Sequence, residues 1–166
     1  DGFDGLALLK TSKDDFIRKM GEPVSTAQIE DDAVSGAATL LTYPWGEARF
    51  FRGEDGDMLY HIDTSGADMK GPRGSQVGMS LSDVTAKFRD MGQLPNDRGS
   101  RGIYYDIAQG YARYTVASDD PLTGLLEYVY VGSGDGTSTI LNYQIQGGRV
   151  ARILLRFLTH RLSMVD

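Results

Sequence analysis

The succession of a serine-capped helix and a glycine-led strand occurs twice in this sequence of 166 residues and limits the folds open to it. Ser12-x-x-Asp15 corresponds to Ser80-x-x-Asp83. In each pair the hydroxyl can accept from a backbone N–H of the first helical turn, and the aspartate lies in that turn's positive field. Further on, the strand-like motif Gly-x-Ala-Arg-aromatic occurs at 46–50 and again at 110–114. A true repeat predicts that the two backbones superpose from cap to motif; the alternative is that any two helix-then-hairpin segments share caps and turns.

Short apolar-alternating runs separated by glycine-rich turns predict strands after each helix. The runs lie at 39–43, 47–52, 58–63, 103–107, 111–117, 125–131, 139–145 and 149–157. The polar stretch 25–36 is predicted to be a loop. The run 149–157 also fits a helical period, but the pair Gly147-Gly148 after a clear strand favours a hairpin and therefore a strand.

These assignments predict an α+β fold of two tandem units, each a short helix packed on an antiparallel β-sheet. The first unit spans residues 1–70 and the second spans 78–166. Residues 71–77 are predicted to link them, because glycine and proline are concentrated in this part of the chain.

The start of the second helix carries the motif Gly78-Met79-Ser80-Leu81-Ser82-Asp83-Val84, and Met91-Gly92 and Pro95 follow at its end. This pattern resembles the opening helix of β-lactamase-inhibitor-protein-like domains and of SmpA/OmlA-type outer-membrane lipoproteins. The resemblance implies an exported or envelope-attached protein that binds protein, with a possible lipid anchor upstream of Asp1. Inhibitor relatives usually carry disulfides, whereas this chain has no cysteine.

Composition excludes several classes of function. The formal net charge of −6 gives no basic field for a phosphate backbone, so no nucleic-acid partner is expected. The absence of cysteine excludes disulfides and thiolate chemistry. The longest apolar runs fall short of the ~18 residues that would span a bilayer, so no transmembrane segment is expected.

Few side chains in this sequence suggest catalysis or metal binding. His61 and His160 fit no triad or metal-ligand spacing, and a hydrogen-bonded or solvent-facing imidazole is the simpler interpretation of His61. The acidic turn at 54–57 could offer oxygens to calcium, but turn chemistry alone accounts for it. We therefore predict no catalytic residue, no metal site, no cofactor and no enzymatic activity.

Aromatic residues in and beside the predicted strands are the sequence feature that favours binding. Tyr128 and Tyr130 lie two residues apart on one strand and therefore share a face. Together with Trp45 at the rim, they are the predicted binding residues, since tyrosine and tryptophan are enriched at interfaces. The alternative is that tyrosine simply favours half-buried strands. The resulting hypothesis is a non-enzymatic protein-binding module acting through exposed sheet faces or the cleft between the units. The alternative is a small-ligand-binding protein or enzyme with its site in that cleft.

Overall fold

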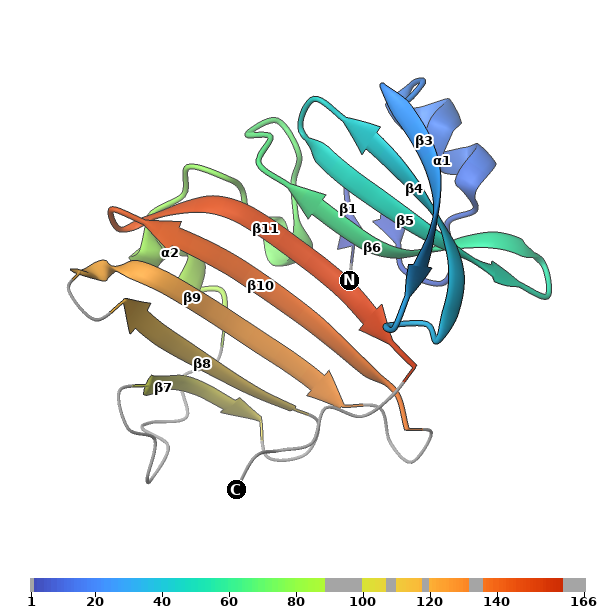
Figure 1. Cartoon of the computed structure of the whole chain (residues 1–166). Helices are drawn as coiled ribbons and strands as arrows, with labels where there is room; N and C mark the ends of the chain where they lie inside the picture. Colours follow the sequence, from blue (N-terminus) through green and yellow to red (C-terminus); the bar gives the residue numbers. More distant parts are fainter. Residues whose placement is uncertain (1, 89–99, 107–109, 118–119, 132–135, 160–166) are drawn as a thin grey trace.

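A computed structural model of the chain describes residues 2–88, 100–106, 110–117, 120–131 and 136–159. Its elements are β1 (Gly2–Phe3), β2 (Leu6–Ala7), α1 (Lys13–Met20), β3 (Ser25–Asp31), β4 (Gly36–Tyr43), β5 (Gly46–Gly53), β6 (Gly56–Thr64), the 3-10 helix η1 (Pro72–Gly74), α2 (Leu81–Thr85), β7 (Ser100–Asp106), β8 (Gly110–Ala117), β9 (Asp120–Val131), β10 (Ser138–Gln146) and β11 (Arg149–Leu158). Strands β3 to β11 form one antiparallel sheet in the order β3-β4-β5-β6-β11-β10-β9-β8-β7, and β1 pairs with β2 (Figure 1).

The sheet is continuous across the two halves of the chain because β6 pairs with β11. His61 lies opposite Arg156, and Asp63 lies opposite Leu154. Strand β6 is the last strand of the first half of the chain, and β11 is the last strand of the second half. Without this pairing, each would expose a row of unpaired backbone groups. The predicted α+β fold of two units, each with its own sheet, is therefore wrong. The chain is mostly β, and its described part has only two short α-helices.

Both helices begin where the sequence predicts. The Ser12 and Ser80 hydroxyls accept from the backbone N–H groups of Asp15 and Asp83, each at 3.1 Å. Each serine also forms an isolated β-bridge with the last strand of its own half of the chain: Ser12 with β6, and Ser80 with β11. The two helix starts thus lie in equivalent places beside the sheet.

The two glycine-led motifs, in contrast, are not equivalent. Residues 46–50 lie in β5, which is adjacent to β6, whereas residues 110–114 lie in β8, which β9 and β10 separate from β11. Along the chain, two strands separate α1 from the first motif. Among the described elements, only β7 separates α2 from the second motif. The prediction that the backbones superpose as far as these motifs is therefore wrong.

All eight predicted strands are present, including the one at 149–157 that also fitted a helical period. The predicted loop at 25–36 is wrong, because residues 25–31 form the edge strand β3 and pair with β4. Its side chains are mostly exposed on both faces, so its sequence lacks the alternation that marks a half-buried strand.

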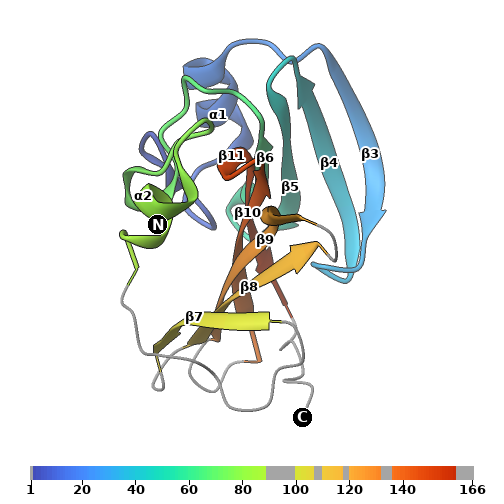
Figure 2. The same ribbon diagram turned by 90° about the vertical axis from the view of Figure 1, so that its left-hand side faces the viewer.

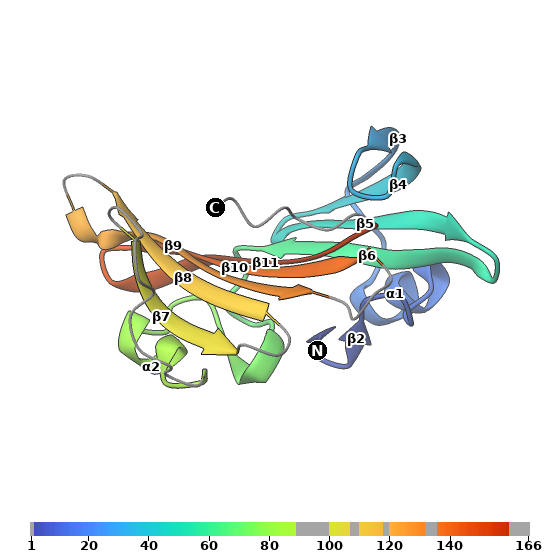
Figure 3. The same cartoon turned by 90° about the horizontal axis from the view of Figure 1, so that it is seen from below.

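Figures 2 and 3 show α1 and α2 on the same face of the sheet, and β3 and β4 bend toward the opposite face. The main hydrophobic core lies between the helices and the sheet. Phe16 of α1 is fully buried there, with its ring 5.3 Å from that of Phe50 and 5.9 Å from that of Tyr43. Val84 and Phe88 place α2 and its following turn on the same core. We call this the covered face of the sheet.

The predicted linker, residues 71–77, is partly buried against this core. Ser75 is fully buried. Its hydroxyl donates to the carbonyl of Pro72 at 2.7 Å and accepts from the Tyr143 hydroxyl at 3.0 Å. Ser75 therefore anchors this connecting segment to Tyr143 of β10.

Candidate binding site on the helix-free face

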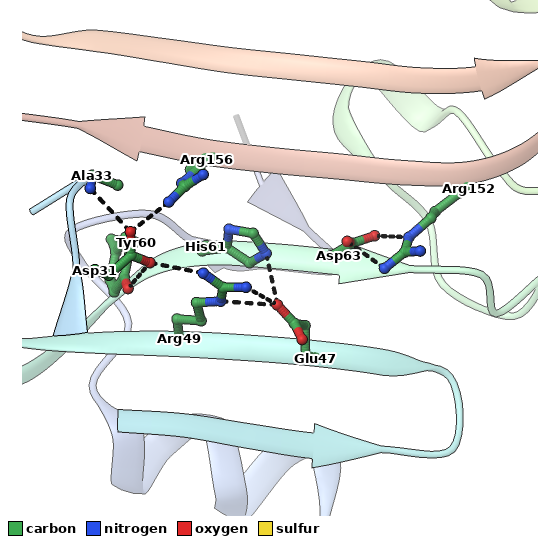
Figure 4. A network of polar contacts seen from close by, with 9 residues as sticks. All are labelled: Asp31, Ala33, Glu47, Arg49, Tyr60, His61, Asp63, Arg152 and Arg156. Atoms are coloured by element: carbon green, nitrogen blue, oxygen red, sulfur yellow. Dashed lines mark hydrogen bonds and ion pairs between the residues drawn. The ribbon is translucent and has the colours of Figure 1, made fainter. Parts of the chain in front are cut away.

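The opposite face of the sheet, which no helix covers in the described part of the chain, carries a cluster of charged side chains (Figure 4). We call it the helix-free face. Alternation on β5, β6 and β11 turns these side chains away from core residues such as Ala48, Ile62 and Ile153. The charge cluster comprises Asp31, Glu47, Arg49, Tyr60, His61, Asp63, Arg152 and Arg156.

Strand register brings members of the cluster together. Arg49 of β5 lies opposite His61 of β6, which in turn lies opposite Arg156 of β11. A register shift after Arg49 leaves Tyr60 as an extra residue on β6. Such a bulge lets two consecutive side chains serve one face, and Tyr60 and His61 both join the cluster.

Asp31, at the end of β3, is the most connected member. Its carboxylate accepts from the Tyr60 hydroxyl at 2.6 Å, Arg49 Nη1 at 2.8 Å, Arg156 Nη2 at 2.5 Å and the Ala33 backbone N–H at 2.9 Å. Burial opposes ionisation of Asp31, but the hydrogen bonds from Tyr60, Ala33 and Arg49 and the charge of Arg156 outweigh it and hold its pKa far below the usual range. Asp31 is therefore a permanently charged centre that fixes two arginines.

Glu47 and His61 form the middle of the cluster. Glu47 Oε1 accepts from Arg49 Nε at 2.8 Å and from Nη2 at 2.6 Å, and His61 Nε2 lies 3.3 Å from the same oxygen. The nearby His61 makes the largest contribution to lowering the pKa of Glu47, whereas burial raises this pKa. Arg49 lowers it further, and the resulting pKa of Glu47 is about 2. Glu47 is thus ionised throughout the physiological range.

His61 is only 2% exposed. Burial lowers its pKa, and the charges of Arg49 and Arg156 add to this effect, against the attraction of Glu47. The ring is therefore neutral at neutral pH. Its contact with Glu47 lacks hydrogen-bond geometry, and neither ring nitrogen has a hydrogen-bond partner among the described residues. The prediction of a hydrogen-bonded or solvent-facing imidazole is wrong for His61, and His160 lies outside the described residues.

Asp63 and Arg152 form the third ion pair. Arg152 Nη2 donates to Asp63 Oδ2 at 2.6 Å, and Nε donates to Oδ1, so the pair is bidentate. The Arg152 side chain is 50% exposed, whereas that of Asp63 is 8% exposed. Strand β5 approaches Asp63 closely: a Cβ on Gly46 would lie 2.0 Å from the Asp63 carbonyl oxygen, so only glycine fits there.

Three arginines balance three carboxylates in the cluster, and the neutral His61 adds no charge. One ligand atom from each of Glu47, His61 and Asp63 lies within 4.8 Å of the other two. Carboxylate and imidazole groups at this spacing are a set that divalent metal ions use.

The residues predicted as binding residues lie elsewhere. The Trp45 ring stacks on Tyr43, with centroids 4.8 Å apart, and packs against the main core. Tyr128 also packs against that core, with its ring 5.6 Å from that of Phe88. Tyr130 is 39% exposed. The structure thus uses Trp45 and Tyr128 in packing, and a binding role for the three stays a prediction.

Sequence reasoning missed the charge cluster, although the sequence contains a signal for it. Glu47 and Arg49, and likewise His61 and Asp63, are spaced two apart on predicted strands and therefore share a face.

In the acidic turn at 54–57, Asp57 forms ion pairs with Lys13 at 2.8 Å and with Arg52 at 3.1 Å, as a surface hairpin turn would.

No described helix combines the length and the apolar character needed to cross a membrane. Comparison of the chain with protein families, with curated proteins and with solved structures finds no match.

Proposed function

We propose that this chain is a non-enzymatic binding module, exported or attached to the cell envelope, whose helix-free face receives a partner protein at the charge cluster. The observation that carries the proposal is the combination of rigidity and access in this cluster. Asp31, buried at the centre, holds Arg49 and Arg156, whose side chains are 24% and 28% exposed. Arg152 reaches further into solvent.

Such an arrangement suits binding because the side chains are already ordered. Each immobilised rotamer-rich side chain costs an interface about 0.5–1.5 kcal/mol, and this cost is smaller where ion pairs hold the side chain before the partner arrives. Arginine is also enriched among the residues that dominate binding energy. Export remains an expectation from the resemblance in the helix motif at 78–84.

Ligand binding between the two halves is a second candidate, favoured by one specific observation. The cluster draws Glu47, Arg49 and His61 from the first run of strands and Arg152 and Arg156 from the second. Polar groups converging from both halves are what a ligand site at the junction of the halves requires.

Capture of partners tests the proposal with a matched pair of variants. Arg152→Ala and Arg18→Ala each remove an arginine that is paired with an aspartate, but Arg18 lies on α1 and is 75% exposed. Immobilised wild type and both variants are incubated with an envelope extract of the producing organism, in the presence of EDTA. We expect a protein retained by the wild type and by Arg18→Ala but reduced with Arg152→Ala. Equal retention by the three proteins, after thermal unfolding has shown all to be folded, would contradict the proposal.

A further inference from the structure

We infer that Glu47, His61 and Asp63 form a binding site for one divalent transition-metal ion of the zinc or cobalt type, on the helix-free face where β5 meets β6. The inference goes beyond protein binding and is tested without a partner. It rests on the spacing of the three ligand atoms, on the buried and unpartnered ring of His61, and on Arg49, which orients Glu47.

The spacing is close to that of a ligand set. Zinc binds histidine nitrogen and carboxylate oxygen at about 2.0–2.2 Å, so two ligands on one tetrahedral ion lie about 3.4 Å apart. His61 Nε2 and Glu47 Oε1 are already 3.3 Å apart. Asp63 completes a triangle with no side longer than 4.8 Å. Rotation of the Asp63 carboxylate, next to a half-exposed arginine, is the adjustment that binding requires.

The buried ring of His61 is the second, independent observation. Its two nitrogens have no hydrogen-bond partner among the described residues, although buried polar groups in folded proteins nearly always have one. Nε2 points toward Glu47 (Figure 4). A metal ion there would bind the lone pair of a neutral imidazole, which is the form that ligates metals.

The two nearest arginines would affect the site in opposite ways. Arg49 fixes Glu47, just as ligating carboxylates in metal sites are themselves hydrogen-bonded, whereas Arg152 holds Asp63 in an ion pair that competes with the metal. Their positive charge opposes that of the ion, so the site is weaker than an all-carboxylate cage. Because Arg152 is half exposed, it can turn into solvent when the ion binds. With three protein ligands, the ion keeps open positions for water or for a partner's carboxylate.

Isothermal titration of the untagged, metal-free chain with Zn²⁺ and Co²⁺ tests the site. His61→Gln removes the imidazole, and His160→Ala removes the other histidine of the sequence as a matched control. We expect one ion per chain for the wild type and for His160→Ala, and an affinity weaker by roughly tenfold or more for His61→Gln. Arg152→Ala should bind several-fold more tightly, because it removes a competing positive charge and frees Asp63. A purely structural role for these residues would not produce tightening.

No saturable binding by the wild type up to about 1 mM metal would overturn the inference, as would equal binding by His61→Gln. If His61→Gln does not fold, ¹⁵N spectra of the histidine rings in the wild type decide the matter. A zinc-induced shift of one His61 ring nitrogen supports the site, and a shift confined to His160 overturns it. Partner capture is measured in EDTA throughout and metal binding is measured without a partner, so the failure of the proposed function and the failure of the metal site are distinguishable.

Discussion

The covered and helix-free faces of this sheet are stabilised in different ways. The covered face is closed by apolar side chains such as Phe16, Phe50 and Tyr143, all fully buried. The helix-free face combines ion pairs around Asp31 with a smaller apolar cluster that includes Tyr60, and its arginine side chains are left partly in solvent. Apolar packing stabilises without specifying a partner, whereas ordered charges give less net stability and more specificity. The difference suggests that the covered face holds the fold and that the helix-free face performs the function.

The largest expected loss of stability comes from a substitution in the covered face. Phe16→Ala should lower the free energy of unfolding by about 3–5 kcal/mol, because it empties a fully buried site among aromatic rings. Urea unfolding followed by circular dichroism measures the change. A loss below about 1 kcal/mol, which is typical of surface substitutions, would show that α1 does not close this core.

The next largest loss of stability comes from a substitution in the helix-free face. Asp31→Asn keeps the shape of the side chain but leaves Arg49 and Arg156 without their shared carboxylate. We expect a loss of about 2–4 kcal/mol, below the 3–5 kcal/mol typical of a broken buried pair because both arginines reach solvent.

The same variant should alter the acid response. Asp31 and Glu47 have folded pKa values below their ordinary ones, so the unfolded chain binds more protons as the pH falls. The part of wild-type stability that these two carboxylates contribute should therefore be complete above about pH 5 and fall steadily from pH 4.5 toward pH 2. Unfolding at several pH values should show a shallower fall for Asp31→Asn. Parallel curves for the two proteins would contradict the assigned ion pairs.

A smaller effect comes from His61 at higher pH. Its folded pKa is below the ordinary value of 6.5, so the unfolded chain gains a proton first and stability falls as the pH drops below 6.5. We expect stability to decrease between pH 6.5 and pH 5 in a chelating buffer. His61→Gln should abolish this part of the curve. Persistence of the full decrease in the variant would assign it to another group.

The smallest effect compares two arginines. Arg18→Ala, on the highly exposed pair with Asp15, should change stability by less than about 0.5 kcal/mol. Arg152→Ala should cost about 1 kcal/mol, because it leaves the buried Asp63 without its bidentate partner. If the two losses, measured by urea unfolding, are equal, the Arg152 pair is an ordinary surface pair.

The sequence predicts the covered face well and the helix-free face poorly, for physical reasons. Caps at Ser12 and Ser80 and the alternation within strands are local signals. The pairing of β6 with β11 leaves no local trace, and neither does the hydrogen bond between Asp31 and Arg156, which are 125 residues apart. The extra residue at Tyr60 also breaks the alternation that would place Tyr60 and His61 on opposite faces. Long-range register and a bulge, which the sequence does not reveal, therefore determine the candidate site.

Site-specific photocrosslinking tests most directly whether the helix-free face is the binding face. A photoreactive residue replaces Leu154, which lies on β11 between Arg152 and Arg156 and leaves the charge cluster intact, or Lys19, which is exposed on α1. Both variants are irradiated with the envelope extract after their folding has been confirmed. We predict an adduct of one defined mass at position 154 and none at position 19. Adducts at position 19 alone, or equally at both positions, would contradict the assignment of binding to the helix-free face.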